Sequence, residues 1–214
     1  MTALARICLV DLRATGELEL AGYLAWLGPG EAARYSRFAR QQRRRQFLVG
    51  RILLRKMLGQ LLAIAPKQIE LIERPGQAPL LDHVKSCIKT SPSPGFSLSH
   101  SGHWIACAVS AGTRLGLDIE IISLERDIDA LAKEVFNPME LALLRQLPMA
   151  QRVPAFYRMW SAQEARYKLG SCDGPCEQPH CISLPHAQLS VALCSAQPLL
   201  IIPALEPVTL CAAG

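Results

Sequence analysis

The sequence predicts an α+β protein built from two similar subdomains, in which helices pack on small antiparallel sheets. Helical spacing of apolar residues dominates residues 31–64 and returns over residues 153–169. Each of these stretches precedes short runs in which apolar and polar residues alternate, as they do in half-buried antiparallel strands. We therefore expect helix followed by sheet in residues 1–111, and the same order again in residues 112–214.

The first half begins with a predicted strand over residues 5–12. Residues 23–28 read as helical or irregular and precede a Gly-Pro-Gly break. The next stretch, residues 31–64, is predicted to be helical and to stop before Pro66. Residues 75–94 are rich in chain-breaking residues and are expected to form turns and loop.

Three short apolar runs follow, over residues 95–99, 104–110 and 114–121. Polar turns containing glycine separate them. This arrangement predicts an antiparallel meander of three strands.

The second half begins with predicted helices over residues 128–133, 138–146 and 153–169, the last of them ended by Gly170. Residues 171–180 resemble a loop. The tail is expected to form two or three strands, drawn from residues 181–184, 188–193 with 199–202, and 207–212.

The overall composition is that of a globular chain of 214 residues, half of them hydrophobic. No apolar run reaches the roughly 18 residues of a membrane span, and the first ten residues lack the build of a secretory signal. We therefore expect a cytoplasmic protein that does not enter a membrane. The eight cysteines are expected to be reduced thiols, because a chain of this length does not need disulfides for stability.

Positive charge is concentrated between residues 34 and 57, which hold nine basic residues and no acidic one. The remainder of the chain has 14 basic and 18 acidic residues. A local basic segment favours a phosphate-bearing ligand or an acidic partner, and nucleic acid would satisfy the same charge. Five of its arginines share one stripe of the predicted helix: Arg37, Arg40, Arg44, Arg51 and Arg55.

Two carboxylates, Asp118 and Glu120, lie two residues apart on a predicted strand and so share one face. Adjacent carboxylates repel each other, and a hard divalent cation with oxygen ligands, Mg²⁺ above all, relieves that repulsion. The alternative is that the pair simply forms the solvent-facing side of the strand.

On the last predicted helix, Trp160, Glu164 and Lys168 follow each other at intervals of four and share a face. The Glu164 and Lys168 pair alone is equally compatible with an ordinary surface ion pair. A separate motif, Ser97 to His103, lies at the end of a strand, where hydroxyls and backbone amides can meet an anion. His100 is the better candidate there, because His103 opens the next strand.

Cys172, Cys176, His180 and Cys181 resemble a zinc cluster only loosely, because their spacing does not match the usual ligand pairs. We expect a loop with incidental cysteines.

Four blocks, taken in order, resemble the larger, single-chain 4′-phosphopantetheinyl transferases, the type of the surfactin-synthetase activator. The blocks are Phe38-Ala39-Arg40 with Gly50-Arg51 and Arg55-Lys56; Phe96-Ser97-Leu98-Ser99-His100-Ser101; Gly116-Leu117-Asp118-Ile119-Glu120; and Trp160-Ser161-Ala162-Gln163-Glu164-Ala165 with Lys168. The resemblance implies a pseudo-dimeric fold and transfer of phosphopantetheine from coenzyme A to a serine of an acyl or peptidyl carrier protein, releasing 3′,5′-adenosine bisphosphate.

By matching position, the resemblance implies that Asp118, Glu120 and Glu164 hold Mg²⁺, and that Ser99, His100, Arg34, Arg51 and Lys168 contact coenzyme A. Glu164 would accept the carrier serine's proton, directly or through a water, and Lys168 would neutralise charge on the leaving group. A monomer without nucleic-acid partners is expected.

Three positions depart from the family pattern, because Glu31, Gln77 and Gln163 stand where cations are usual. Arg44 and Arg45 are possible substitutes for the missing charge. Because of these departures, a second hypothesis is a catalytically weak relative that binds coenzyme A or carrier protein without efficient transfer. A third hypothesis is a nucleic-acid binder that uses residues 34–56.

Overall fold

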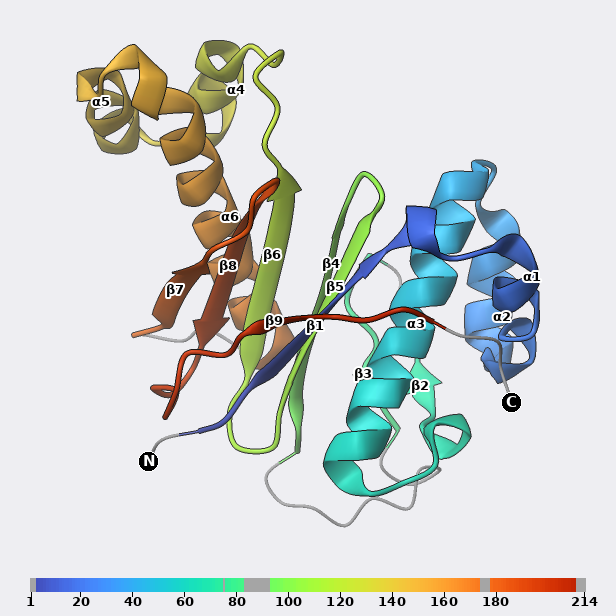
Figure 1. Ribbon diagram of the computed structural model, residues 1–214. Coiled ribbons are helices and arrows are strands. Elements are labelled where there is room, and N and C mark those ends of the chain that lie inside the picture. Colours follow the sequence, from blue (N-terminus) through green and yellow to red (C-terminus); the bar gives the residue numbers. More distant parts are fainter. Residues whose placement is uncertain (1–2, 75, 83–92, 174–177, 211–214) are drawn as a thin grey trace.

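The fold consists of two helix-on-sheet halves whose sheets pack against each other (Figure 1). The computed structural model describes residues 3–74, 76–82, 93–173 and 178–210. The main elements of the first half are β1 (Arg6–Asp11), α1 (Glu17–Ala21), α2 (Pro29–Arg37), α3 (Gln41–Leu62), β2 (Leu71–Ile72), β3 (Leu80–Leu81), β4 (Gly95–Ser101) and β5 (Trp104–Ser110). Those of the second half are β6 (Leu115–Ile121), α4 (Ile128–Val135), α5 (Pro138–Gln146), α6 (Met149–Asp173), β7 (His180–Leu184), β8 (Leu189–Ser195) and β9 (Leu205–Pro207).

The first sheet has the order β4-β5-β1-β9 and is apolar on both faces. Cys8 and Val10 of β1 join the core under α3, whereas the alternate residues Ile7 and Leu9 join the core shared with the second sheet. This alternation of faces explains why β1 reads as continuously hydrophobic. The order of layers is therefore α3, first sheet, second sheet, α6.

The second sheet has the order β6-β8-β7 and lies against α6 (Figure 1). Gly116 allows the closest approach, since a Cβ at this position would lie 1.9 Å from the carbonyl oxygen of Ala165. Leu117 and Ile119 face the inter-sheet core. Asp118 lies on the opposite face of β6, toward α6, where it contacts Lys168. The α+β fold with two similar halves is confirmed.

The predicted three-stranded meander is wrong in its last strand. β4 and β5 form the expected hairpin, but β6 leaves it and pairs with β8. β9, from the far end of the chain, instead extends the first sheet by pairing in parallel with β1. Residues 199–202 form no strand beyond a single bridge between Leu199 and Ala3. Alternation identifies a strand's buried face but not its partner.

The single helix predicted over residues 31–64 is two helices. The backbone is extended at Phe38 (ψ 119°) and at Arg40 (ψ 126°), so α2 ends at Arg37 and α3 begins at Gln41. The predicted arginine stripe is consequently divided, with Arg37 on α2 and Arg44, Arg51 and Arg55 on α3. α6 begins four residues before the predicted start and continues past Gly170 to Asp173.

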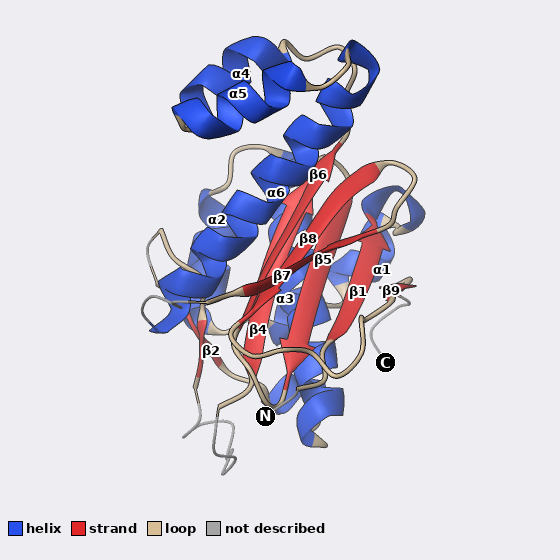
Figure 2. Cartoon of the chain, turned by 90° about the vertical axis from the view of Figure 1, so that its left-hand side faces the viewer, coloured by secondary structure: helices blue, strands red, loops and turns tan. Residues whose placement is uncertain are grey.

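Helices α4 and α5 project from the end of α6 beyond the two sheets (Figure 2). Asp127 and Asn137 cap their N-termini by accepting backbone N–H groups. Phe136, Phe156 and Tyr157 form a small separate core that joins them to α6.

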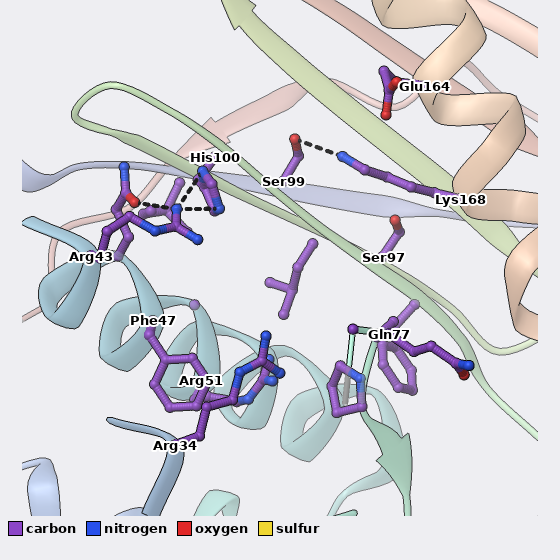
Figure 3. A pocket seen from close by; sticks show the side chains of 18 of the residues that line it. Arg34, Arg43, Phe47, Arg51, Gln77, Ser97, Ser99, His100, Glu164 and Lys168 are labelled. Carbon is purple, nitrogen blue, oxygen red and sulfur yellow. Dashed lines mark hydrogen bonds between the residues drawn. The ribbon is translucent and has the colours of Figure 1, made fainter. Parts of the chain in front are cut away.

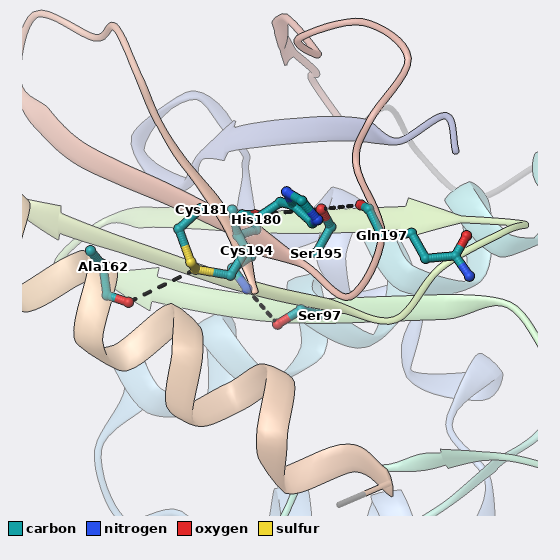
Figure 4. Close-up of a disulfide and its surroundings, with 8 residues drawn as sticks. Ser97, Ala162, His180, Cys181, Cys194, Ser195 and Gln197 are labelled. Carbon is teal, nitrogen blue, oxygen red and sulfur yellow. Dashed lines mark hydrogen bonds between the residues drawn. A yellow bond between two sulfur atoms is a disulfide. The ribbon is translucent and has the colours of Figure 1, made fainter. Parts of the chain in front are cut away.

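Two cysteines of the second sheet are not reduced thiols, contrary to the prediction. Cys181 and Cys194 lie opposite each other on β7 and β8 and form a disulfide (Figure 4). Cys194 packs beneath α6 against Ala165 and Leu169. Cys8 and Cys107 are buried free thiols. Of the four residues that resemble a zinc cluster only loosely, Cys181 is in this disulfide, and Cys176 and the side chain of Cys172 lie outside the described residues.

Across the described ranges, no helix has the length and apolar content that a bilayer span requires.

Candidate active site

A cavity of about 410 Å³ lies between the two halves (Figure 3). Side chains from α2 and α3 form one wall, β4 forms the floor, and α6 supplies the opposite wall. The turn at residues 76–79 closes one side. Its charged lining residues are Arg34, Arg43, Arg51, Glu164 and Lys168. The cavity therefore brings together side chains from both halves of the chain.

Arg34 and Arg51 form the basic wall, and one carboxylate binds both of them. Arg34 Nη1 donates to Glu73 Oε2 over 2.7 Å, and Arg51 Nε donates to Glu73 Oε1 over 2.8 Å. Both guanidinium groups also lie over the ring of Phe47. Burial lowers the pKa of Arg51, and the adjacent Glu73 opposes that shift. The buried guanidinium of Arg51 is therefore paired with a carboxylate of the protein itself.

Arg55 is buried away from the cavity and pairs with Glu31, one of the residues noted as a departure from the family pattern. Arg55 Nη1 donates to Glu31 Oε1 over 2.9 Å, and Nη2 donates to Oε2. Glu31 also accepts the backbone N–H of Gly28, which caps α2. Both side chains are 1% exposed or less. This pair joins α2 to α3 and is structural.

Arg43 is a cavity residue that sequence reasoning missed. Its Nη1 donates to Nε2 of His100 over 2.7 Å, so the imidazole and the guanidinium lie side by side (Figure 3). His100 is exposed overall, yet partial desolvation together with the positive charges of Arg43 and Lys168 lowers the pKa of His100 to about 4. His100 is therefore neutral at pH 7 and accepts a hydrogen bond from Arg43.

A ladder of alternate serines on β4 joins the edges of the two sheets. The hydroxyl oxygens of Ser97, Ser99 and Ser101 accept the backbone N–H groups of Leu117 (2.9 Å), Ile119 (3.2 Å) and Ile121 (3.0 Å) in β6. The strands do not form a backbone ladder with each other. The serine-rich motif thus pairs an otherwise unsatisfied strand edge, which the sequence reading did not anticipate.

Ser99 also connects this ladder to charged groups. Its hydroxyl donates to Asp118 Oδ1 over 3.0 Å and accepts from Lys168 Nζ over 3.0 Å. Lys168 Nζ in turn donates to Asp118 Oδ1 over 2.7 Å. Asp118 is 3% exposed, and its other oxygen, Oδ2, is buried without a hydrogen-bond partner among the residues that the structure describes. Three predicted site residues therefore meet, with one carboxylate oxygen left unsatisfied.

Glu120 and Glu164 are the other two predicted metal ligands, but with Asp118 they do not form a preformed metal site. Glu120 Oε2 accepts from Ser101 over 2.8 Å, and burial, together with the charge of Asp118, raises the pKa of Glu120. Glu164 projects from α6 into the cavity (Figure 3). Within the described part of the chain, no three acidic, imidazole or thiol side chains are grouped closely enough to hold a metal ion as they stand.

The proposed substitutes for missing cations have other roles. Arg44 Nε donates to the carbonyl of Phe38, and Arg45 donates to the carbonyls of Leu12 and Thr15. Arg43, in contrast, lines the cavity.

Of the departing positions, Gln77 lines the cavity, whereas Gln163 is not among its described lining residues. The sequence does not show which of the nine basic residues between residues 34 and 57 line the cavity. Arg43 faces β4 only because of how α3 packs. Glu73 had no signal at all in the sequence.

The cavity between the two halves is rich in guanidinium groups, and Glu164 and Lys168 lie on its opposite side, so its lining is chemically suited to an anionic ligand. Two family models match successive parts of the chain: residues 15–112 match the N-terminal region of 4′-phosphopantetheinyl transferase, and residues 114–195 match the 4′-phosphopantetheinyl transferase superfamily. The chain belongs to the 4′-phosphopantetheinyl transferase family.

Curated relatives support this placement. The chain is 36% identical to 4′-phosphopantetheinyl transferase HetI of Nostoc sp. over 71% of its length and 62% of the relative's. It is 27% identical to 4′-phosphopantetheinyl transferase Sfp of Bacillus subtilis, over 68% of this chain and 61% of that one. It is 28% identical to 4′-phosphopantetheinyl transferase AcpT of Salmonella typhimurium, over 75% of this chain and 81% of that one. The chain thus spans less than two thirds of the length of HetI and Sfp.

Proposed function

We propose that this protein transfers the 4′-phosphopantetheine group of coenzyme A to a serine of an apo acyl or peptidyl carrier protein. The carrying observation is the cavity itself, which sets a basic wall on α2 and α3 against Lys168 and Glu164 on α6. A ligand with a central diphosphate needs positive charge on several sides, and a nucleophile aligned with one phosphorus atom. The family to which the chain belongs supports the same reaction.

Magnesium fits the donor chemistry beside Lys168. Asp118 and Glu120 are oxygen donors on one strand face, and the unpartnered Oδ2 of Asp118 is an orphaned buried oxygen of the kind that a cation satisfies. Asp118, Glu120 and Glu164 would hold the ion, which would neutralise charge on the diphosphate when bound.

The chain's own residues divide the remaining work. The serine hydroxyl of the carrier forms a bond to the phosphorus that bears pantetheine, and the bond from that phosphorus to the bridging oxygen breaks. 3′,5′-Adenosine bisphosphate leaves with the electron pair of that bond. Glu164 takes the serine proton, directly or through a water, and Lys168 places positive charge beside the leaving group.

The other cavity residues hold the ligand. Arg34 and Arg51 bind phosphate oxygens from the basic wall, and Ser99 and His100 lie against the ligand from β4.

A second candidate is a protein that binds coenzyme A or carrier protein without efficient transfer. Two observations favour it: Gln77 lines the cavity where the family has lysine, and Glu73 binds both arginines of the basic wall. Each reduces the positive charge available to an anionic ligand.

Incubation with coenzyme A, Mg²⁺ and an apo carrier protein tests the proposal by mass spectrometry. We expect the carrier to gain the mass of one phosphopantetheine arm, and Asp118→Ala or Glu164→Gln to abolish that gain. Calorimetric binding of coenzyme A without any gain in carrier mass, across acyl and peptidyl carriers, would select the second candidate instead. Restoring lysine at position 77 is then expected to raise activity.

A further inference from the structure

The basic wall carries less net charge than its arginines suggest. Arg34 and Arg51 contribute two positive charges, and Glu73, which is paired with both, contributes one negative charge. The sum, two minus one, is a single positive charge. Glu31 is paired with Arg55 away from the cavity, so Glu73 is the carboxylate that contacts both arginines of the wall.

Glu73 accepts hydrogen bonds from both arginines of the basic wall, although Glu73 is not among the described residues that line the cavity. Its two oxygens accept from Arg34 and Arg51 separately, and its side chain is 11% exposed. Guanidinium groups bind carboxylates and phosphates with the same planar, paired hydrogen bonds. A phosphate that bound the Nε and Nη2 edge of Arg51, or Nη1 of Arg34, would therefore compete with Glu73 for those N–H groups.

The network would survive the loss of this carboxylate. Arg51 Nε also lies 3.3 Å from Glu31 Oε1, so Arg51 keeps a negatively charged partner when Glu73 is replaced. The side chain of Arg34 is 37% exposed and can be hydrated. The role of Glu73 is thus separable from that of the buried pair between Glu31 and Arg55.

We propose that Glu73 is a specificity-determining residue, a built-in anion that competes with the ligand and shifts the cavity's preference toward donors of lower negative charge. For the identity of the ligand, the inference rests on the proposed function. The cavity is then expected to discriminate little between coenzyme A and 3′-dephospho-coenzyme A, which lacks a phosphate of nearly two negative charges. Removing the charge of Glu73 restores the preference for coenzyme A.

Calorimetric titration of Glu73→Gln with both ligands tests this directly. Loss of one negative charge beside two phosphate-binding arginines is expected to raise affinity for coenzyme A roughly tenfold, and that for the dephospho form roughly threefold. Glu206→Gln is the matched control, because Glu206 forms an ion pair of the same type with Arg6 on the surface, outside the cavity lining. It is expected to leave both affinities unchanged.

Glu73→Asp gives a second measurement should the glutamine variant not fold. The shorter side chain keeps its charge but cannot reach both arginines, so a gain of roughly threefold for coenzyme A is expected. No gain in either folded variant, or an equal gain for the two ligands, would overturn the proposal.

Inorganic pyrophosphate, titrated in parallel, separates the two hypotheses. If the natural protein does not bind coenzyme A, the proposed function fails, yet a tighter affinity of Glu73→Gln for pyrophosphate would still support the competing-anion role. If coenzyme A binds with equal affinity to the natural protein and to Glu73→Gln, the proposed function stands and only the role of Glu73 fails.

Discussion

Two buried ion clusters, one in each half of the molecule, use similar residues in opposite ways. Between α2 and α3, Glu31 has partners at both oxygens, Arg55 and the N–H of Gly28. Between β6 and α6, Asp118 Oδ1 accepts hydrogen bonds from Lys168 and Ser99, whereas Oδ2 has no partner within the described part of the chain. The closed cluster holds elements together, whereas the open cluster retains binding capacity beside the cavity.

The sharpest test of this comparison exchanges each carboxylate for its isosteric amide. Glu31→Gln leaves the guanidinium of Arg55 buried without a charged partner, which is expected to cost about 3 kcal/mol or more of unfolding free energy. For a chain of this size that corresponds to a fall in melting temperature of roughly 10 °C. Calorimetric thermal unfolding would measure it.

Asp118→Asn is the counterpart in the open cluster. Lys168 is 29% exposed and can be hydrated when its partner is lost, so the expected stability change is below about 1 kcal/mol. Carrier modification, in contrast, is expected to fall at least about a hundredfold. An equally large loss of stability in both variants would remove the distinction between the clusters.

A smaller effect is expected where the serine ladder meets the open cluster. Ser97→Ala and Ser99→Ala each leave one N–H of β6 without its hydroxyl partner, so both should lower the free energy of unfolding by about 1 to 2 kcal/mol.

Only Ser99 also contacts Asp118 and Lys168, so only Ser99→Ala is expected to slow transfer, by about tenfold. Denaturant unfolding and a carrier-loading assay on the same samples measure both quantities. Equal slowing in the Ser97 variant would show that the ladder acts only through strand packing.

The smallest effect concerns the pH dependence of the basic side of the cavity. His100 binds its proton only near pH 4 in the folded protein, whereas an unfolded histidine does so near 6.5. The unfolded state therefore binds more protons between these values, and the contribution of His100 to stability, complete above pH 6.5, is lost as the pH falls toward 4.

His100→Gln is expected to lose less melting temperature between pH 6.5 and 4.5 than the natural protein. His180→Gln, which changes another exposed histidine but one outside the cavity lining, is the control and should behave like the natural protein. An unchanged pH profile in the His100 variant would contradict the assigned cause.

Residue patterns are enough to predict most of the helices and strands and to say which side chains share a face. The alternation over residues 95–121 identified all three strands, and it placed Asp118 and Glu120 together on β6, because side-chain direction repeats every two residues. The order of motifs also identified the family, since the four blocks span both halves.

The contacts between these elements depend on how distant segments pack. β6 pairs with β8, and three serine hydroxyls join its other edge to β4. Glu73 becomes the anion of Arg34 and Arg51 although 39 and 22 residues separate them along the chain. Periodicity records the face on which a side chain lies, but its contacts depend on where distant segments pack, and this carries no local signal.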